Sequence, residues 1–295
     1  MARRYYILDV FTDRPLAGNP LAVVLDSGGL DDARMQAIAA EFNLSETVFV
    51  SAPEAERHRA ALRIFTPRRE LPFAGHPTIG TAVLLAALDR AGEAGAVAFG
   101  LEERAGVVPC VVEVEGEGHG HGRFRAPVLP RALDGPGEPE RLAAALGLEP
   151  GEVGLGRHRP SRHDAGVPFT FVPVASLGAL ARAAPRPEAP GHDGLESLYL
   201  YARAADGRGF RARMFAPGLG VREDPATGSA AAAFAGVLMQ FEPLGDGTHD
   251  VEIGQGWEMG RPSRIGLQMV IRDGALASVE IAGAAVIVAE GRLRL

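Results

Sequence analysis

The sequence predicts an α+β protein made of two similar domains, each with one strongly apolar helix. Segments with strand and helix patterns do not alternate strictly, which argues against a doubly wound sheet. Two helical segments, residues 78–88 and 227–238, are apolar on nearly all sides and should be buried. Each follows a loop of similar sequence. We expect domains of residues 1–124 and 125–295, with the last strand able to pack back on the first domain.

Short strands separated by turn residues are expected in the first domain, at residues 5–10, 21–25, 47–50, 61–65, 96–99 and 107–114. An amphipathic helix is predicted over residues 31–41, with Asp31 or Asp32 near its cap. In the second domain we expect helices at 138–146 and 176–183, and strands at 167–174, 195–202 and 210–215. A loop at 216–226 then leads into the second apolar helix, and the segment from residue 251 onward reads as strands.

The starts of the two apolar helices are alike in sequence. Proline, glycine, a hydroxyl residue and alanine recur at the same spacing in 76–82 (HPTIGTA) and 224–230 (DPATGSA), which suggests an internal duplication. A helix start carries N–H donors without intrahelical partners and a partial positive charge, so two such starts could bind a carboxylate or a developing enolate. Alternatively, Gly80 and Gly228 merely allow close packing of the helices.

Composition excludes several kinds of chemistry. The formal net charge of −7 disfavours binding to nucleic acid. All 30 positive side chains are arginine, so catalysis by a Schiff-base or phosphate-loop lysine is impossible. The single cysteine, Cys110, excludes a catalytic cysteine pair and favours a cytoplasmic location. No apolar run approaches the roughly 20 residues of a membrane span.

Three side chains are candidates for acid–base chemistry. Glu46 lies at the edge of an apolar strand, where partial burial would suit it to proton transfer, although the pattern alone favours an exposed strand-end glutamate. His76 and Asp224 occupy equivalent places before a proline at the two helix starts, and capping alone could explain Asp224. The histidines at 119, 121, 158 and 163 lack metal-site spacing, so we expect them to be solvated and expect no metal or cofactor.

Several separate segments, in this order, carry a resemblance to a known family. They are 9–12 (DVFT), 18–20 (GNP), 43–47 (NLSET), 71–78 (LPFAGHPT), 222–230 (REDPATGSA), 255–256 (QG) and 259–263 (MGRPS). With them the sequence resembles the PhzF-like isomerases of phenazine biosynthesis, which share a fold with diaminopimelate epimerase. It departs from that epimerase at the chemistry, because the cysteine pair is missing.

The resemblance implies two pseudo-symmetric domains, each a β-roll around a central helix, with the active site in the cleft between them. Glu46 would take a proton from one carbon of a small anionic substrate and return it to another. The other polar positions of the family's site fall on His76, Asp224 and Ser229, with backbone donors at Gly75 and Gly228. In the family's phenazine enzyme the substrate is a dihydro-hydroxyanthranilate. No cofactor is implied, and a homodimer is expected.

Two other functions remain open at this point. The chain could be an epimerase or racemase that uses two bases, with His76 or Asp224 opposite Glu46. It could also be a non-catalytic protein that binds a small acid. Against two bases, the second-half segment 167–172 (VPFTFV) looks like the counterpart of residues 44–49, and it carries Phe169 in the place of Glu46.

Overall fold

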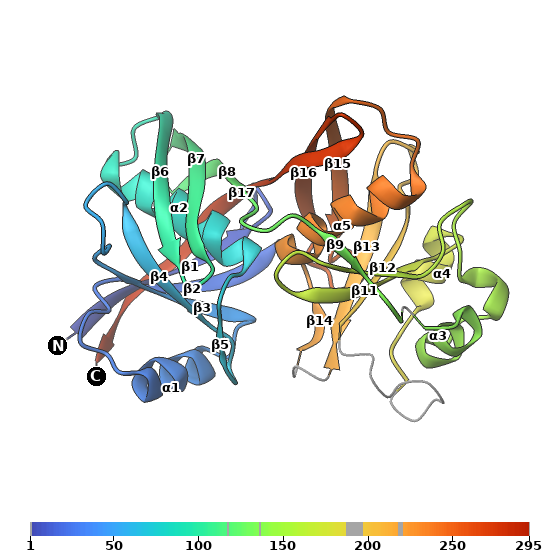
Figure 1. Cartoon of the computed structure of the whole chain (residues 1–295). Helices are drawn as coiled ribbons and strands as arrows, with labels where there is room; N and C mark the ends of the chain where they lie inside the picture. The colour runs from blue at the N-terminus through green and yellow to red at the C-terminus, as the bar shows by residue number, and fades with distance from the viewer. Residues whose placement is uncertain (1, 117, 136, 187–196, 218–220, 295) are drawn as a thin grey trace. The chain divides into compact units, whose positions relative to one another are not determined.

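The computed structural model describes residues 2–116, 118–135, 137–186, 197–217 and 221–294, and the chain divides into two compact units (Figure 1). Unit 1 consists of Met1–Pro127 and Glu280–Leu295, and unit 2 consists of Val128–Val279. The described residues form 17 strands and five α-helices, so the fold is a mixed one of α and β elements. None of the described helices is long and apolar enough to cross a membrane.

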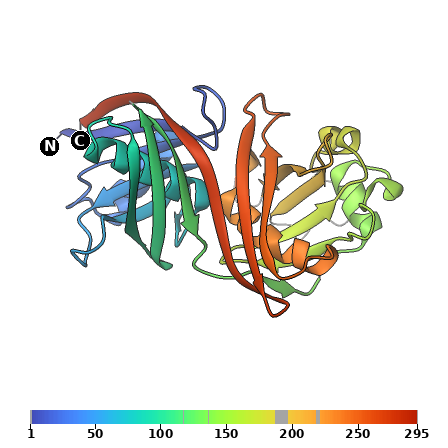
Figure 2. The ribbon, with the colours of Figure 1, turned by 90° about the horizontal axis from the view of Figure 1, so that it is seen from above.

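Eight strands of unit 1 close into a barrel, because each pairs with the next and the last pairs with the first. The β2–β3 and β4–β6 pairs are parallel and the others are antiparallel. Figure 2 shows the long β17 beside β8. The barrel strands, in order, are β1 (Ala2–Val10), β2 (Asn19–Val24), β3 (Glu46–Ser51), β4 (Ala60–Phe65), β6 (Gly95–Glu103), β7 (Gly106–Gly116), β8 (His119–Arg125) and β17 (Ala275–Arg294).

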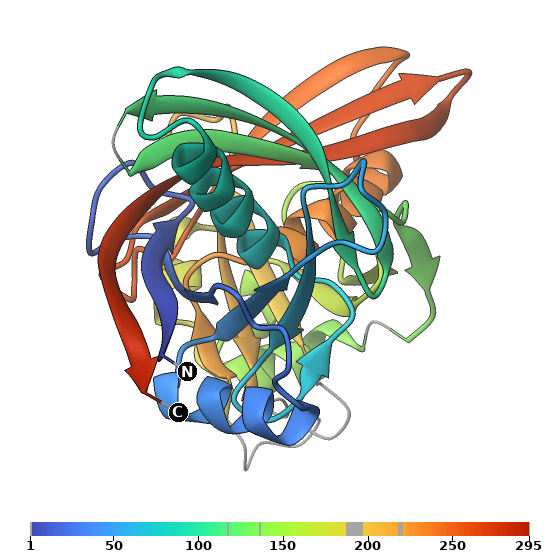
Figure 3. The same ribbon diagram turned by 90° about the vertical axis from the view of Figure 1, so that its left-hand side faces the viewer.

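Helix α2 (Gly75–Asp89) lies inside this barrel (Figure 3), and its first 13 residues are all buried. This confirms the burial predicted from its apolar composition. A β-carbon on Gly80 would lie 2.6 Å from Leu21 and 2.7 Å from Val10 in the barrel wall, so Gly80 serves close packing. The helix begins three residues earlier than predicted, because Pro77 is tolerated in a first helical turn.

Helix α1 (Asp32–Phe42) packs on the outside of unit 1, where Met35 and Ile38 join a cluster with Phe49 and Phe65. The side chain of Asp31 accepts a hydrogen bond from the backbone N–H of Arg34, which confirms the predicted N-cap. The two-residue strand β5 (Glu70–Leu71) pairs with β4 just before α2 begins.

Unit 2 contains one sheet whose β11–β12 and β13–β15 pairs are parallel. The remaining neighbours in the order given below pair in antiparallel fashion. A short strand, β14 (Val221–Asp224), pairs with β13 within the segment 216–226, which was predicted wrongly to be all loop. The sheet strands, in order, are β9 (Arg131–Leu133), β10 (Ser161–Asp164), β11 (Pro168–Pro173), β12 (Leu198–Arg203), β13 (Phe210–Ala216), β15 (Gly247–Gln255) and β16 (Ser263–Arg272).

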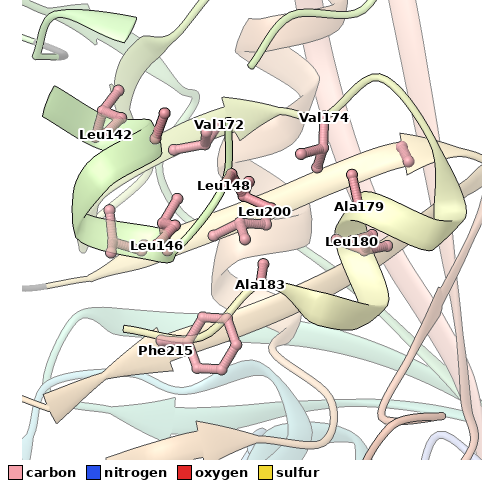
Figure 4. Close-up of a cluster of buried hydrophobic side chains, with 13 residues drawn as sticks. Leu142, Leu146, Leu148, Val172, Val174, Ala179, Leu180, Ala183, Leu200 and Phe215 are labelled. Atoms are coloured by element: carbon pink, nitrogen blue, oxygen red, sulfur yellow. The ribbon is translucent and has the colours of Figure 1, made fainter. Parts of the chain in front are cut away.

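Helices cover both faces of this sheet. Phe234 of α5 (Gly228–Phe241) packs against the rings of Phe171 and Tyr201 on one face. Val172 and Leu200, the alternate residues of the same strands, point to the other face. There they join a cluster with α3 (Pro139–Leu146) and α4 (Leu177–Arg182), which Figure 4 shows.

Candidate active site

Glu46 and His76 come together in unit 1. Glu46 is the first residue of β3, and His76 is the second residue of α2. His76 Nε2 lies 3.4 Å from Glu46 Oε2, and the Glu46 side chain is only 16% exposed. The alternative of an exposed strand-end glutamate is therefore wrong. Gly75, also named by the resemblance, is the first residue of the same helix.

His76 is an uncharged side chain in this setting. It is 4% exposed, and burial lowers its pKa to about 3. A neutral imidazole carries a single N–H, so one ring nitrogen donates and the other accepts. His76 Nδ1 lies 3.3 Å from the Nδ2 amide nitrogen of Asn19, which is fully buried.

The position of Asn19 depends on a tight turn before β2. Gly18 has φ +63°, and a β-carbon there would lie 2.3 Å from the carbonyl oxygen of Val10. Only glycine fits such a turn. The same loop is fixed by Asp9, whose carboxylate accepts a hydrogen bond of 2.6 Å from the backbone N–H of Leu16. The family resemblance drew attention to residues 18–20, but gave no role to Asn19.

A second group of polar residues surrounds the start of α5 in unit 2. Asp224 ends β14, and Thr227 occupies the N-cap position of the helix without a capping hydrogen bond from its side chain. The Thr227 hydroxyl donates a 2.6 Å hydrogen bond to Asp224 Oδ2. Gln255 Nε2 donates to Thr227 Oγ1 at 3.0 Å and to the Asp224 carbonyl at 2.8 Å, while its Oε1 accepts from the Thr227 N–H at 3.3 Å. Gln255 is fully buried, and the sequence offered no role for it or for Thr227.

Gly228 and Ser229 are the first two residues of α5, and Ser229 is partly exposed. The first N–H groups of a helix have no intrahelical acceptor, so this helix start offers donors and partial positive charge to an anionic group. The predicted site residues therefore fall into two groups. Glu46, His76 and Gly75 belong to unit 1, whereas Asp224, Gly228 and Ser229 belong to unit 2.

A buried carboxyl group that the sequence did not single out lies beside the start of α2. Glu103, the last residue of β6, accepts a 2.7 Å hydrogen bond from the hydroxyl of Thr78. Glu103 is 8% exposed, and burial raises its pKa to about 8. The carboxyl group is therefore largely protonated at neutral pH.

The prediction of solvated histidines is wrong for His158 and His163, which are 3% and 2% exposed. His158 lies 3.0 Å from the Tyr201 hydroxyl and 2.9 Å from Glu242, and His163 lies 3.1 Å from Gln240. These partners are distant in sequence, so the local sequence around the two histidines, which is rich in arginine, gave no sign that their side chains are buried. Among the residues that the structure describes, no three or more His, Cys, Asp or Glu side chains are grouped to hold a metal ion.

Comparisons with known proteins agree over the whole chain. The profile of a family described as "Phenazine biosynthesis-like protein" matches residues 8–291. An uncharacterized isomerase of Mesorhizobium japonicum is 49% identical, over 99% of this chain and 98% of the relative. The trans-2,3-dihydro-3-hydroxyanthranilate isomerase of Pseudomonas aeruginosa is 38% identical over 99% of each chain. The crystal structure of a Bacillus anthracis phenazine biosynthesis protein of the PhzF family has 27% identity and a TM-score of 0.86, covering 100% of each chain.

Proposed function

The chain belongs to the phenazine biosynthesis-like (PhzF) family and is an isomerase, and from that premise we propose that it moves one proton on a small cyclic carboxylate with Glu46 as the acid–base residue. The observation that carries the proposal is the partly buried Glu46 carboxyl group 3.4 Å from the neutral His76 ring. A relative of 38% identity is named for its action on trans-2,3-dihydro-3-hydroxyanthranilate, and we propose a substrate of the same chemical class for this chain.

The proposed reaction needs a single base. The Glu46 carboxylate takes a proton from a ring carbon, and the electron pair of the broken C–H bond is delocalised through adjoining double bonds to the substrate carboxyl group. The protonated Glu46 then gives the same proton to a different ring carbon on the same face. Substrate and product are isomers, so the reaction consumes no oxidant, reductant or other reactant. A positioned acid–base group of this kind contributes about 10²–10⁴-fold to a rate.

We further propose that the groups in the two units bind one substrate together, in a cleft between the domains. Neither group by itself contains both a base and the groups needed to bind a substrate. Unit 1 supplies a carboxylate base, whereas unit 2 supplies Asp224 and the N–H donors at Gly228 and Ser229, which suit an amino group and a carboxylate. This division supports an anionic substrate that contacts both units.

The order of strand pairings supports an origin by duplication. The pairs β1–β2, β2–β3, β3–β4, β4–β6 and β6–β7 run antiparallel, parallel, antiparallel, parallel and antiparallel. The pairs β10–β11, β11–β12, β12–β13, β13–β15 and β15–β16 repeat that order. Each series also contains a short extra strand, β5 or β14, followed directly by the buried helix. We therefore propose two pseudo-symmetric domains.

This correspondence corrects one expectation from the sequence. Phe169 lies in β11, which pairs in parallel with β12 as β2 pairs with β3. The pairing of β3 with β4 starts at Thr47, and the pairing of β12 with β13 starts at Leu198. The residues just before these are Glu46 and Ser197, so Ser197 is the counterpart of Glu46. Neither serine nor phenylalanine in this position would act as a general base. The second unit therefore still lacks an equivalent of Glu46, which supports a mechanism with a single base.

A Glu46→Gln variant tests the assigned base. We expect it to fold and to lose at least about 10²-fold in turnover of trans-2,3-dihydro-3-hydroxyanthranilate, since an amide cannot accept the proton. Product formation is followed by absorbance and mass spectrometry. Glu41→Gln, the same change on the exposed face of α1, should leave turnover unchanged. A folded Glu46→Gln variant with full turnover would remove Glu46 from the mechanism.

The same assay in deuterated water separates the two-base alternative from the proposal. A second base on the opposite face would incorporate deuterium with inversion at one carbon, whereas a single base transfers hydrogen on one face between two carbons. A folded, wild-type protein that turns over no cyclic or acyclic carboxylate would instead favour a non-catalytic acid-binding role.

We also propose that the protein is a cytoplasmic homodimer. The single cysteine, Cys110, is buried, and burial raises its pKa, which suits a thiol that stays reduced and unreactive. Light scattering during size-exclusion chromatography distinguishes a dimer from a monomer of 30.9 kDa.

A further inference from the structure

The contacts of His76 determine which of its ring nitrogens carries the proton. Burial keeps the ring neutral, so it has one N–H and one lone pair. Nε2 faces Glu46 Oε2 at 3.4 Å, and Nδ1 faces Asn19 Nδ2 at 3.3 Å. Glu46 Oε2 can only accept a hydrogen bond, whereas Asn19 Nδ2 can only donate one, so only one tautomer of His76 suits both neighbours.

A carboxylate oxygen only accepts hydrogen bonds, so an attractive contact with Glu46 requires the proton on Nε2. Nδ1 then holds the lone pair, and the buried side chain beside it must donate. The amide NH₂ group of Asn19 does so. If Asn19 presented its carbonyl oxygen instead, the proton would be drawn to Nδ1, and two lone pairs would face each other between Nε2 and Glu46.

We propose that Asn19 is a positioning residue that holds His76 as the Nε2–H tautomer, so that Nε2, which lies 3.4 Å from Glu46 Oε2, carries a proton and cannot act as a base. This inference rests on the proposed role of Glu46. It assigns to Asn19 a function that its place in the turn at 18–20 does not reveal.

The tautomer of His76 affects the reaction while Glu46 holds the proton taken from the substrate. An imidazole with a lone pair at Nε2 would compete for that proton, whereas an Nε2–H cannot accept it. Asn19 thereby keeps the proton on Glu46 until it returns to the substrate, as transfer on a single face requires.

The tautomer can be measured directly in the ligand-free wild-type protein. Two-bond ¹H–¹⁵N correlation spectra report which ring nitrogen of each of the eight histidines is protonated. The signals of His76 are those missing from a His76→Gln variant. We expect a protonated Nε2 and a lone pair on Nδ1 from about pH 5 to 9. A proton on Nδ1 of His76 would overturn the proposal without any need for a variant.

An Asn19→Asp variant tests the cause, because the new carboxylate can only accept. We expect the proton to move to Nδ1 or both nitrogens to become protonated, with kcat falling at least about tenfold and KM changing less. Asn43→Asp changes an exposed asparagine three residues before Glu46, and should alter neither the tautomer nor kcat. A folded Asn19→Asp variant with an unchanged tautomer or full kcat would contradict the assignment.

The two readouts also separate this inference from the proposed function. The spectra of the ligand-free protein test the role of Asn19 whatever the substrate is. Full turnover by Glu46→Gln would refute the assigned base, and the tautomer could still be as stated. Loss of turnover in Glu46→Gln together with a proton on Nδ1 of His76 would leave the proposed function standing and refute the role of Asn19.

Discussion

At the scale of single residues, the protonated carboxyl group of Glu103 makes stability depend on pH. Its pKa is raised to about 8 in the folded protein, from an ordinary value of 4.5. Between these two pH values the folded state holds a proton that the unfolded state has lost. Folding is then accompanied by proton uptake, so this group makes the protein less stable as the pH rises from about 4.5 to 8.

Replacing Glu103 by glutamine should remove this dependence, because an amide resembles the protonated acid and cannot ionise. We expect Glu103→Gln to match the wild type near pH 4.5 and to exceed its stability by on the order of 2–4 kcal/mol above pH 8. Urea unfolding at a series of pH values measures the difference. Glu113→Gln, on the exposed side of β7, should show no such trend. A wild-type advantage at pH 8 would contradict the prediction.

The site residues that could be predicted from the sequence differ in chemical type from those that could not. Glu46, His76 and Asp224 carry titratable groups at strand and helix ends, and the family resemblance assigns them roles. Asn19 and Gln255 are neutral amides that act through other residues. Their roles depend on contacts between segments 57 and 28 residues apart, which no local pattern encodes.

At the scale of elements, apolar composition predicted the buried helix inside the barrel but not its first residue. Local chemistry permits Pro77 either before α2 or within its first turn, and packing in the barrel selects the second. The short β14 was missed for a related reason. A four-residue strand takes its stability from pairing with β13, and its own sequence shows little alternation.

The tight fit of α2 in the barrel predicts opposite outcomes for one substitution in two helices. Gly80→Ala places a methyl group against the fully buried Leu21 and Val10, and should destabilise the protein by about 1–3 kcal/mol despite the better helix propensity of alanine. In α4, Gly178→Ala meets only ordinary contacts at 3.6 Å or more, and should stabilise by up to about 1 kcal/mol. Thermal unfolding monitored by circular dichroism compares the two variants. Equal effects would show that packing in the barrel is looser than the distances indicate.

At the scale of the whole molecule, unit 1 is completed by the end of the chain. Strand β17 pairs with β8 through Glu280–Val286 and with β1 through Ala285–Arg294, so it closes the barrel between the first and the last strand of the N-terminal segment. Residues 1–127 alone would leave two unpaired strand edges around α2. Such edges expose backbone hydrogen-bonding groups and favour aggregation.

Truncation after Val279 should therefore open the barrel while sparing the sheet of unit 2. We expect backbone amides of β1 and β8 to lose most of their protection against hydrogen exchange, and those of β12 and β13 to keep it. Mass spectrometry of proteolytic peptides resolves the two sets. Truncation after Gly291 removes only the last pairs with β1, so it should affect only the start of that strand. Protection of β8 that survives the longer truncation would mean that the N-terminal segment closes its barrel without β17, and that the return of the chain from unit 2 is not needed for unit 1 to fold.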